Sequence, residues 1–415
     1  MLPIQQWYFD KEPAEVSHYN QSVLLGINKA IDEFVLRAAV EQVTQHHDAL
    51  RFRYYQQEGK WHQEYGNAKG ELIVVDLQSE TNASVKTLIT EHAEKYQRSL
   101  NILKGELIKV VLIKTPASEA YDRLFIVVHH LVIDGVSWRI LLDDFERLLS
   151  ALNSNLEIDL GNKTSSYRQW YETLKQYGES KNVTAQKAYW QQVVSNKIYL
   201  PADNEFNGKV KVKDISHYRV LLDAEQTRRL LQEVPKVYHS EINDFLLCAL
   251  AITICKWSNS EKIIIGLEGH GREGIGEGID TSRTVGWFTT LYPVLLEIEK
   301  GKIEDSWIKS IKEQLRQVPD KGLGYGVLKY INKEEALQNT EPWEIVFNYL
   351  GQLDNIVRES KWFAGAGEST GAGMSEELLT EKLSVNSVVR AGQLIVNWSY
   401  SKNHYNDETI ANLAT

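Results

Sequence analysis

The chain has 415 residues, of which 43% are hydrophobic and 25% are charged, and its formal net charge is −10 at pH 7. This composition is typical of a globular protein. Because the chain is longer than one ordinary domain, we expect about two or three compact units. The negative charge and the lack of a basic run argue against a nucleic acid or an anionic membrane as partner.

No segment predicts membrane insertion or export. The most apolar stretch, Phe245–Ile254, is too short to span a bilayer and predicts a buried helix. Met1–Phe9 lacks the basic and apolar regions of an export signal, so we expect a cytoplasmic protein. Cys248 and Cys255 fall two turns apart on the apolar helix, too far for a disulfide, and we expect both to be buried thiols.

The first part of the chain alternates strand and helix patterns. Helical spacing of apolar residues runs from residue 31 to 45 and from 137 to 152, and one or two helices are expected within residues 167–190. These elements predict an α/β lobe with a mixed sheet over residues 1–178. Its strands are expected at residues 22–26, 50–55, 61–65, 72–77, 110–114 and 124–129.

Residues 179–415 repeat this style and predict a second α/β lobe. The small, polar stretch Ala364–Met374 predicts a mobile loop that crosses between the lobes near residues 361–380. Asn406–Thr415 starts like a capped helix and stops early, so we expect the chain to be cut from a longer protein. Helices are expected at residues 224–234, 241–257 and 303–318, strands at 217–222, 262–267, 286–296 and 344–349, and a hairpin at 384–400.

A pair of histidines directly follows the apolar strand Leu124–Val128. His129 and His130 begin a turn that contains Asp134 and Gly135, so a rigid strand delivers titratable groups to a loop. A neutral histidine near pH 7 can accept or give a proton, which makes it the commonest general acid or base. The alternative is a structural pair bonded to the backbone. A second pair, His46-His47, lacks such a strand and loop, and we interpret it as structural.

Glu268 follows another apolar strand, Ile263–Leu267, and opens the segment Glu268–Glu273. Its glycines allow the backbone to approach a ligand closely. The alternative is a salt-bridged turn in which Arg272 pairs with Glu268 or Glu273. Glycines continue beyond this segment, but they are interspersed with glutamates and open no helix, so we expect a flexible loop rather than a phosphate site.

Asn348 and Tyr349 stand at a strand end, where their polar tips could hydrogen-bond an intermediate. No metal-ligand spacing of the HExxH or CxxC kind occurs, so no metal site is expected.

Together, these segments resemble the epimerization domain of nonribosomal peptide synthetases, a branch of the condensation-domain superfamily. This resemblance implies a two-lobed, chloramphenicol-acetyltransferase-like α/β fold with an active-site tunnel between the lobes. The choice of the epimerization branch depends on Val136-Ser137-Trp138, on Glu268–Glu273 and on Phe347–Gly351. The matching segments, in the family's order, are Pro3–Phe9, His129–Trp138, Glu268–Glu273, Arg283–Pro293, Gly322–Gly326 and Phe347–Gln352.

The resemblance implies a function. Such domains invert the α-carbon of an aminoacyl or peptidyl thioester on the phosphopantetheine arm of a carrier domain, which requires removal of a proton, an enolate and reprotonation on the opposite face. By similarity, His130 and Glu268 are the proton-transfer groups, one from each lobe, and which is acid and which is base stays open. His129, Asp134, Asp144, Arg272, Asn348 and Tyr349 are implied as supporting residues.

The resemblance also implies partners and competing functions. We expect no cofactor of the domain's own, an upstream carrier domain and other synthetase domains as partners, and a monomer when the domain is excised. One alternative is a condensation domain that forms an amide bond with the same histidine. The other is a non-catalytic carrier-docking module, for which a degraded His130 or Glu268 would be the sign, and neither is degraded.

Overall fold

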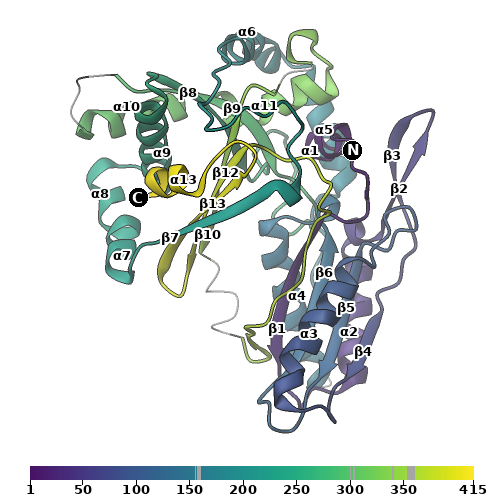
Figure 1. Cartoon of the computed structure of the whole chain (residues 1–415). Helices are drawn as coiled ribbons and strands as arrows, with labels where there is room; N and C mark the ends of the chain where they lie inside the picture. Colours follow the sequence, from purple (N-terminus) through teal and green to yellow (C-terminus); the bar gives the residue numbers. More distant parts are fainter. Residues whose placement is uncertain (155, 157–159, 300, 302–303, 339–340, 353–359) are drawn as a thin grey trace. The chain divides into compact units, whose positions relative to one another are not determined.

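The computed structural model describes residues 1–154, 156, 160–299, 301, 304–338, 341–352 and 360–415. It divides into two compact α/β units (Figure 1). Unit 1 comprises Met1–Glu172, Gly276–Phe288 and Asn355–Leu378, and unit 2 comprises Thr173–Ile275, Thr289–Asp354 and Leu379–Thr415. Each unit therefore combines segments that are far apart in the sequence, whereas the sequence analysis drew two continuous lobes.

Unit 1 contains a mixed sheet with the strand order β11-β1-β6-β5-β4. Only β4 and β5 run parallel, and the other neighbours are antiparallel. A separate hairpin joins β2 to β3. The strands of unit 1 are β1 (Asn20–Ile27), β2 (Phe52–Gln57), β3 (Lys60–Tyr65), β4 (Leu72–Asp76), β5 (Ile108–Lys114), β6 (Asp122–His129) and β11 (Phe363–Gly365).

Helices cover the sheet of unit 1 on both faces (Figure 1). On one face, Val85, Ile89 and Ala93 of α3 form a core cluster with Val111 and Phe125 of the sheet. On the other face, α2 and α4 pack against each other. The helices are α1 (Pro3–Asp10), α2 (Glu33–His46), α3 (Asn82–Gln97), α4 (Gly135–Asn153) and the start of α5 (Tyr167–Gly178).

Unit 2 contains a second mixed sheet, with the order β7-β13-β12-β10-β8-β9. Strand β10 is central and runs parallel to both of its neighbours, β12 and β8, while the outer pairs are antiparallel. Its strands are β7 (Ile215–Leu221), β8 (Lys262–Gly269), β9 (Thr290–Glu297), β10 (Ile345–Gln352), β12 (Leu383–Arg390) and β13 (Gln393–Ser401).

Helices of unit 2 contact both outer parts of this sheet, and α9 and α10 pack against each other. They are α6 (Lys181–Ser195), α7 (Ala224–Gln232), α8 (Val234–Tyr238), α9 (Ile242–Ser258), α10 (Glu304–Arg316), α11 (Leu323–Gly326) and α13 (Asp407–Ala414). Single helical turns lie at Asp48–Arg51, His130–Val132, Val212–Asp214, Pro319–Gly322, Val327–Ile331 and Glu335–Leu337.

The structure confirms the predicted α/β class and the two mixed sheets, and it corrects two local predictions. The predicted strand over residues 286–296 begins only at Thr290, because the backbone of Gly286 and Phe288 is bonded to the start of α4 instead. Part of the stretch predicted as a mobile loop, Ala364–Met374, pairs with β1 through β11. The predicted helix at 303–318 is α10, although its first predicted residue lies outside the described residues.

Two further expectations can be compared with the described residues. Among them, no helix combines the length and apolar character needed to cross a bilayer. Cys248 and Cys255 are both buried on α9, as predicted, and burial raises the pKa of each thiol to about 11.

Candidate functional site

The strand β6 delivers His130 to the edge of the unit 1 sheet. Nearly every residue of β6 is buried, as its apolar sequence predicts. His130 follows at the first position of a helical turn, and its backbone N–H still donates to the carbonyl of Tyr19, the residue before β1, 2.8 Å away. Its side chain is partly exposed. A partly exposed imidazole on a rigid strand end is suited to proton transfer.

His129 has a different environment from its neighbour. It is fully buried, and Nε2 lies 3.0 Å from the Val16 carbonyl while Nδ1 accepts from Leu131 N–H at 3.2 Å. Since both ring nitrogens bond to the backbone, the ring is held as the neutral Nε2–H tautomer. Burial lowers the pKa of His129 to about 3, so it stays uncharged at neutral pH. These contacts give His129 a structural environment.

Asp134 connects the histidine turn to the segment Arg283–Phe288. It caps α4, where one carboxylate oxygen accepts from Ser137 N–H at 2.7 Å. The other oxygen accepts from Phe288 N–H at 3.0 Å. The Ser137 hydroxyl donates to the Gly286 carbonyl at 2.8 Å and accepts from the Gly286 N–H at 3.1 Å. Hydrogen bonds thus join the histidine turn and the start of α4 to the segment Arg283–Phe288 within unit 1.

Aromatic rings enclose the imidazole of His130. Tyr19 is stacked on it with ring centroids 5.0 Å apart, and Trp287 lies at 4.3 Å. Burial lowers the pKa of His130 to about 4, against the opposing effects of backbone hydrogen bonds and of the Asp134 carboxylate. The ring is therefore neutral at pH 7 and can accept a proton. Within the described residues, the buried Trp287 Nε1 has no hydrogen-bond partner.

Asp144 is completely buried on α4 and joins two other segments of unit 1. One of its oxygens lies 2.8 Å from His47 Nε2, and the other accepts from the Arg283 guanidinium. His46, His47 and Asp144 bring their ligand atoms within 4.8 Å of one another. A cation there would have to displace Arg283 from the carboxylate, so the cluster has the character of a structural ion-pair network.

Glu268 lies in unit 2, near the end of β8. One carboxylate oxygen accepts from the Asn348 side-chain amide of β10 at 2.6 Å. Because β8 and β10 are parallel and pair Leu267 with Phe347, the next residues lie side by side on one sheet face. The carboxylate is thus held at a defined position by a neighbouring strand.

The remaining predicted residues of unit 2 lie near these strand ends. Tyr349 follows Asn348, and burial raises the pKa of its hydroxyl. The Arg272 N–H donates to His270 Nδ1 at 3.0 Å, and His270 Nε2 lies 3.1 Å from Glu273. This histidine–carboxylate contact lies within the turn for which the sequence analysis considered a salt bridge of Arg272.

The structure thus gathers His129, His130 and Asp134 in unit 1, with Asp144 further along α4, and Glu268, Asn348, Tyr349 and Arg272 in unit 2. Sequence reasoning missed Tyr19, Gln21 and Trp287, which contact His130. The one signal for Tyr19 and Gln21 was their spacing of two residues where the chain enters β1, which places both side chains on one face.

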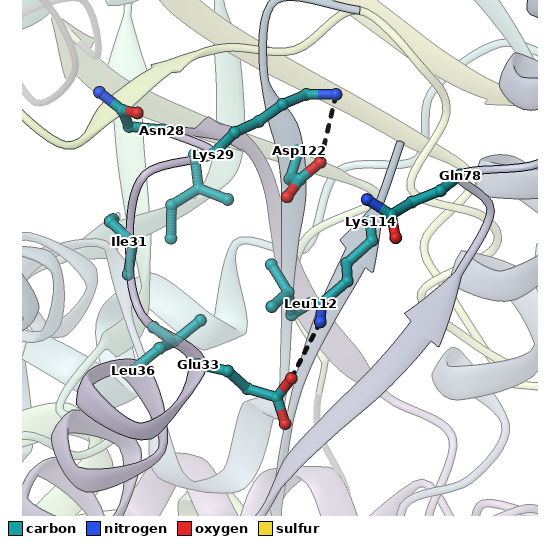
Figure 2. A pocket seen from close by; sticks show the side chains of 10 residues that line it. Asn28, Lys29, Ile31, Glu33, Leu36, Gln78, Leu112, Lys114 and Asp122 are labelled. Atoms are coloured by element: carbon teal, nitrogen blue, oxygen red, sulfur yellow. Dashed lines mark hydrogen bonds and ion pairs between the residues drawn. The ribbon is translucent and has the colours of Figure 1, made fainter. Parts of the chain in front are cut away.

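A cavity of about 200 Å³ lies elsewhere in unit 1 (Figure 2). It is at the Ile27–Asp122 end of the β1–β6 pair, roughly 23 Å along the strands from the His129 end. Its charged side chains are paired: Lys114 with Glu33 at 3.0 Å and Lys29 with Asp122 at 3.6 Å. This cavity is therefore separate from the histidine site.

Comparisons with known proteins identify the family of the chain. The family described as "Condensation domain" matches residues 1–415. A linear gramicidin synthase protein of Brevibacillus parabrevis is 39% identical over 430 residues, covering 100% of this chain and 6% of that protein. Tyrocidine synthase 1 of the same organism is 34% identical over 430 residues, covering 100% of this chain and 39% of that protein. The chain therefore spans only a small part of these curated relatives.

Solved structures are similar over the whole chain. The crystal structure of the epimerization domain from the third module of tyrocidine synthetase B has a TM-score of 0.90 and 34% identity, covering 100% of this chain and 93% of that one. The starter condensation domain of rhizomide synthetase has a TM-score of 0.76 with 16% identity, covering 100% and 91%. The latter likeness shows a shared fold alone.

Proposed function

Because the chain belongs to the condensation-domain family, we propose that it is an epimerization domain of a nonribosomal peptide synthetase. It equilibrates the L and D configurations of an aminoacyl or peptidyl thioester, which arrives on the phosphopantetheine arm of an upstream carrier domain. The domain acts in the cytoplasm beside other synthetase domains, is monomeric when excised, and needs no cofactor of its own.

The observation that carries this proposal is a positioned carboxylate in addition to a neutral histidine. Glu268 is held by Asn348 at 2.6 Å, and burial keeps His130 uncharged at pH 7. Inversion of a carbon centre needs two proton-transfer groups, one for each face of the enolate, whereas amide formation needs only one base. The similarity to a solved epimerization domain supports the same choice.

In the proposed reaction one group removes the α-proton, and the electron pair of the broken C–H bond moves onto the thioester carbonyl as an enolate. The other group, which enters the cycle protonated, gives its proton to the opposite face, and exchange with solvent then restores both groups. The reverse reaction exchanges the roles of His130 and Glu268, so each is an acid in one direction and a base in the other. No oxidant, reductant or co-reactant is required.

The other residues support these two groups in the proposal. Asp134 fixes the histidine turn, Asp144 anchors α4, and Asn348 orients Glu268. We assign Arg272 and Tyr349 to the shape and polarity of the site, and His129 to the support of its neighbour.

One assay separates the three candidate functions. An L-aminoacyl-phosphopantetheinyl carrier is incubated with the domain in deuterated water, and α-deuterium uptake and the D/L ratio are followed. Deuterium uptake with loss of configuration supports epimerization. An amide product that forms only with an added acceptor supports condensation, and neither product supports a docking module.

Two substitutions test the assigned residues against matched controls. Glu268→Gln and His130→Gln should each lower the exchange rate by at least about 100-fold, the usual contribution of a general acid or base. Glu297→Gln is the control for the first, because Glu297 is an exposed residue on β9 that pairs with Lys262 at the far end of β8. His62→Gln on the β2–β3 hairpin is the control for the second. Full exchange by Glu268→Gln would refute its role.

A further inference from the structure

A glutamine that the sequence analysis did not single out contacts the reactive face of His130. Gln21 lies on β1, and its side-chain nitrogen is 2.9 Å from His130 Nε2. Its side-chain oxygen accepts from the Trp138 indole Nε1–H at 2.7 Å. Three elements of unit 1 thus meet at one amide: β1, the turn after β6, and the first turn of α4.

The orientation of this amide follows from donor chemistry. An indole N–H can only donate, so the atom of Gln21 that faces Trp138 must be the oxygen. The amide nitrogen then faces His130, and an amide N–H can also only donate. His130 Nε2 must therefore be the acceptor, without a proton of its own.

The second ring nitrogen agrees with this assignment. His130 Nδ1 lies 2.9 Å from the Ile133 carbonyl, which can only accept. Nδ1 therefore carries the proton of the neutral ring. Gln21 and Ile133, at opposite sides of the imidazole, specify the same tautomer.

The other groups around the ring do not specify a tautomer. Tyr19 and Trp287 present ring faces or edges at 5.0 and 4.3 Å, and the ring nitrogens of His129 bond to the backbone. Asp134 favours the charged ring through its negative charge, although both of its oxygens accept backbone N–H groups. Gln21 opposes protonation of the ring, because a protonated Nε2–H would face the N–H donor of the Gln21 amide.

We propose that Gln21, oriented by Trp138, is a positioning residue that keeps His130 in its neutral Nδ1–H form, with the Nε2 lone pair available for the proton of the substrate. The amide occupies that lone pair in the free domain and gives way when the substrate α-carbon takes its place. This inference rests on the proposed function for its catalytic meaning. The tautomer itself does not depend on that function.

The test begins with the tautomer in the free domain. The protein is labelled with ¹⁵N-histidine, and His130 is assigned by its loss from the spectrum of His130→Gln. Two-dimensional spectra should show an unprotonated Nε2 and a protonated Nδ1 at pH 7. A protonated Nε2 in the wild-type domain would overturn the proposal.

Gln21→Glu replaces the hydrogen-bond donor that faces His130 Nε2 with an acceptor of nearly the same size, because a carboxylate accepts where the amide donates. Because Nδ1–H still donates to the Ile133 carbonyl, Nε2 should keep its proton up to a higher pH than in the wild-type domain, and the titration of His130 and the pH profile of exchange should both move upward by about one to three pH units. Gln56→Glu adds the same charge on the exposed end of β2 and should move neither. An unchanged tautomer and titration in Gln21→Glu would contradict the proposal.

Trp138→Phe keeps the aromatic ring but releases the amide oxygen of Gln21. The amide can then rotate and offer its oxygen to Nε2, so an Nε2–H tautomer should appear beside the Nδ1–H form that the Ile133 carbonyl still favours. This variant decides the question if Gln21→Glu does not fold. A single Nδ1–H tautomer in Trp138→Phe would show that Trp138 does not orient the glutamine. If the tautomers behave as expected but no exchange occurs, the positioning role stands and the epimerization function fails.

Discussion

Replacing Asp134 with alanine should destabilise unit 1 far more than loss of an ordinary helix cap. The carboxylate accepts two backbone N–H groups, from Ser137 and Phe288, which are 0% and 2% exposed. Loss of the cap costs about 1 kcal/mol, and removal of the acceptor from a buried N–H adds about 1–3 kcal/mol. We therefore expect Asp134→Ala to lower the free energy of unfolding by about 2–4 kcal/mol.

Asp32→Ala is the matched control within the same unit. Asp32 also caps a helix, α2, but it is exposed and accepts only from Phe34 N–H, at 2.6 Å. Its loss should cost about 1 kcal/mol. Asp134→Asn should lie between the two, since the amide oxygen can keep one of the two bonds.

The assay must report on unit 1 alone, because two compact units can unfold in separate steps. Hydrogen exchange measured by mass spectrometry on peptides that contain Phe288 gives the local free energy of opening. Equal losses in Asp134→Ala and Asp32→Ala, within about 0.5 kcal/mol, would refute the role of Asp134 as the link between the two motifs.

Three further predictions follow from the burial and contacts of individual groups. Burial lowers the pKa of His129 to about 3 in the folded chain, whereas the unfolded chain binds this proton as the pH falls below the usual 6.5. The free energy of unfolding should therefore fall by about 2 kcal/mol at pH 5. Urea titrations of His129→Gln should show a weaker pH dependence. Asn348→Leu should remove the side-chain bond from Asn348 to the Glu268 carboxylate and lower the exchange rate about tenfold or more, with normal unfolding curves as its control. An unchanged rate would exclude the orienting role. Cys248 and Cys255 should resist iodoacetamide at pH 8 in the folded chain and react in urea, as followed by intact mass, and rapid labelling of the folded chain would contradict their burial.

Local sequence patterns predicted most of the strands and the position of His130, because an apolar run followed by polar residues marks where a buried strand emerges. The helix α3 was missed. Its buried residues Val85, Ile89 and Ala93 form a narrow stripe among polar residues, so the helical period is weak. The return of Gly286 and Phe288 to α4 was also missed, since no local pattern records a contact between distant segments.

The environment of His130 depends on such distant contacts. Gln21 and Tyr19 reach it through the antiparallel register of β1 and β6, in which Asn20 lies opposite His129. A shift of that register by one residue would turn both side chains to the other face of the sheet. The periodicity of a single sequence identifies the two strands but not their register. It could therefore predict the position of His130 but not its contacts with Gln21 and Tyr19.

The segment that carries Trp287 shows how closely these contacts depend on one another. A side chain at Gly286 would meet the Tyr167 ring at 2.5 Å, and the Tyr167 hydroxyl donates to the Trp287 carbonyl at 2.7 Å. The glycine therefore allows Tyr167 to hold the backbone of the residue whose ring lies 4.3 Å from His130. Asp134 fixes the same segment at Phe288, one residue further on. The electrostatic environment of the imidazole is thus set by backbone contacts on both sides of Trp287, and a change at any of them acts on the proton affinity of His130 without touching the ring.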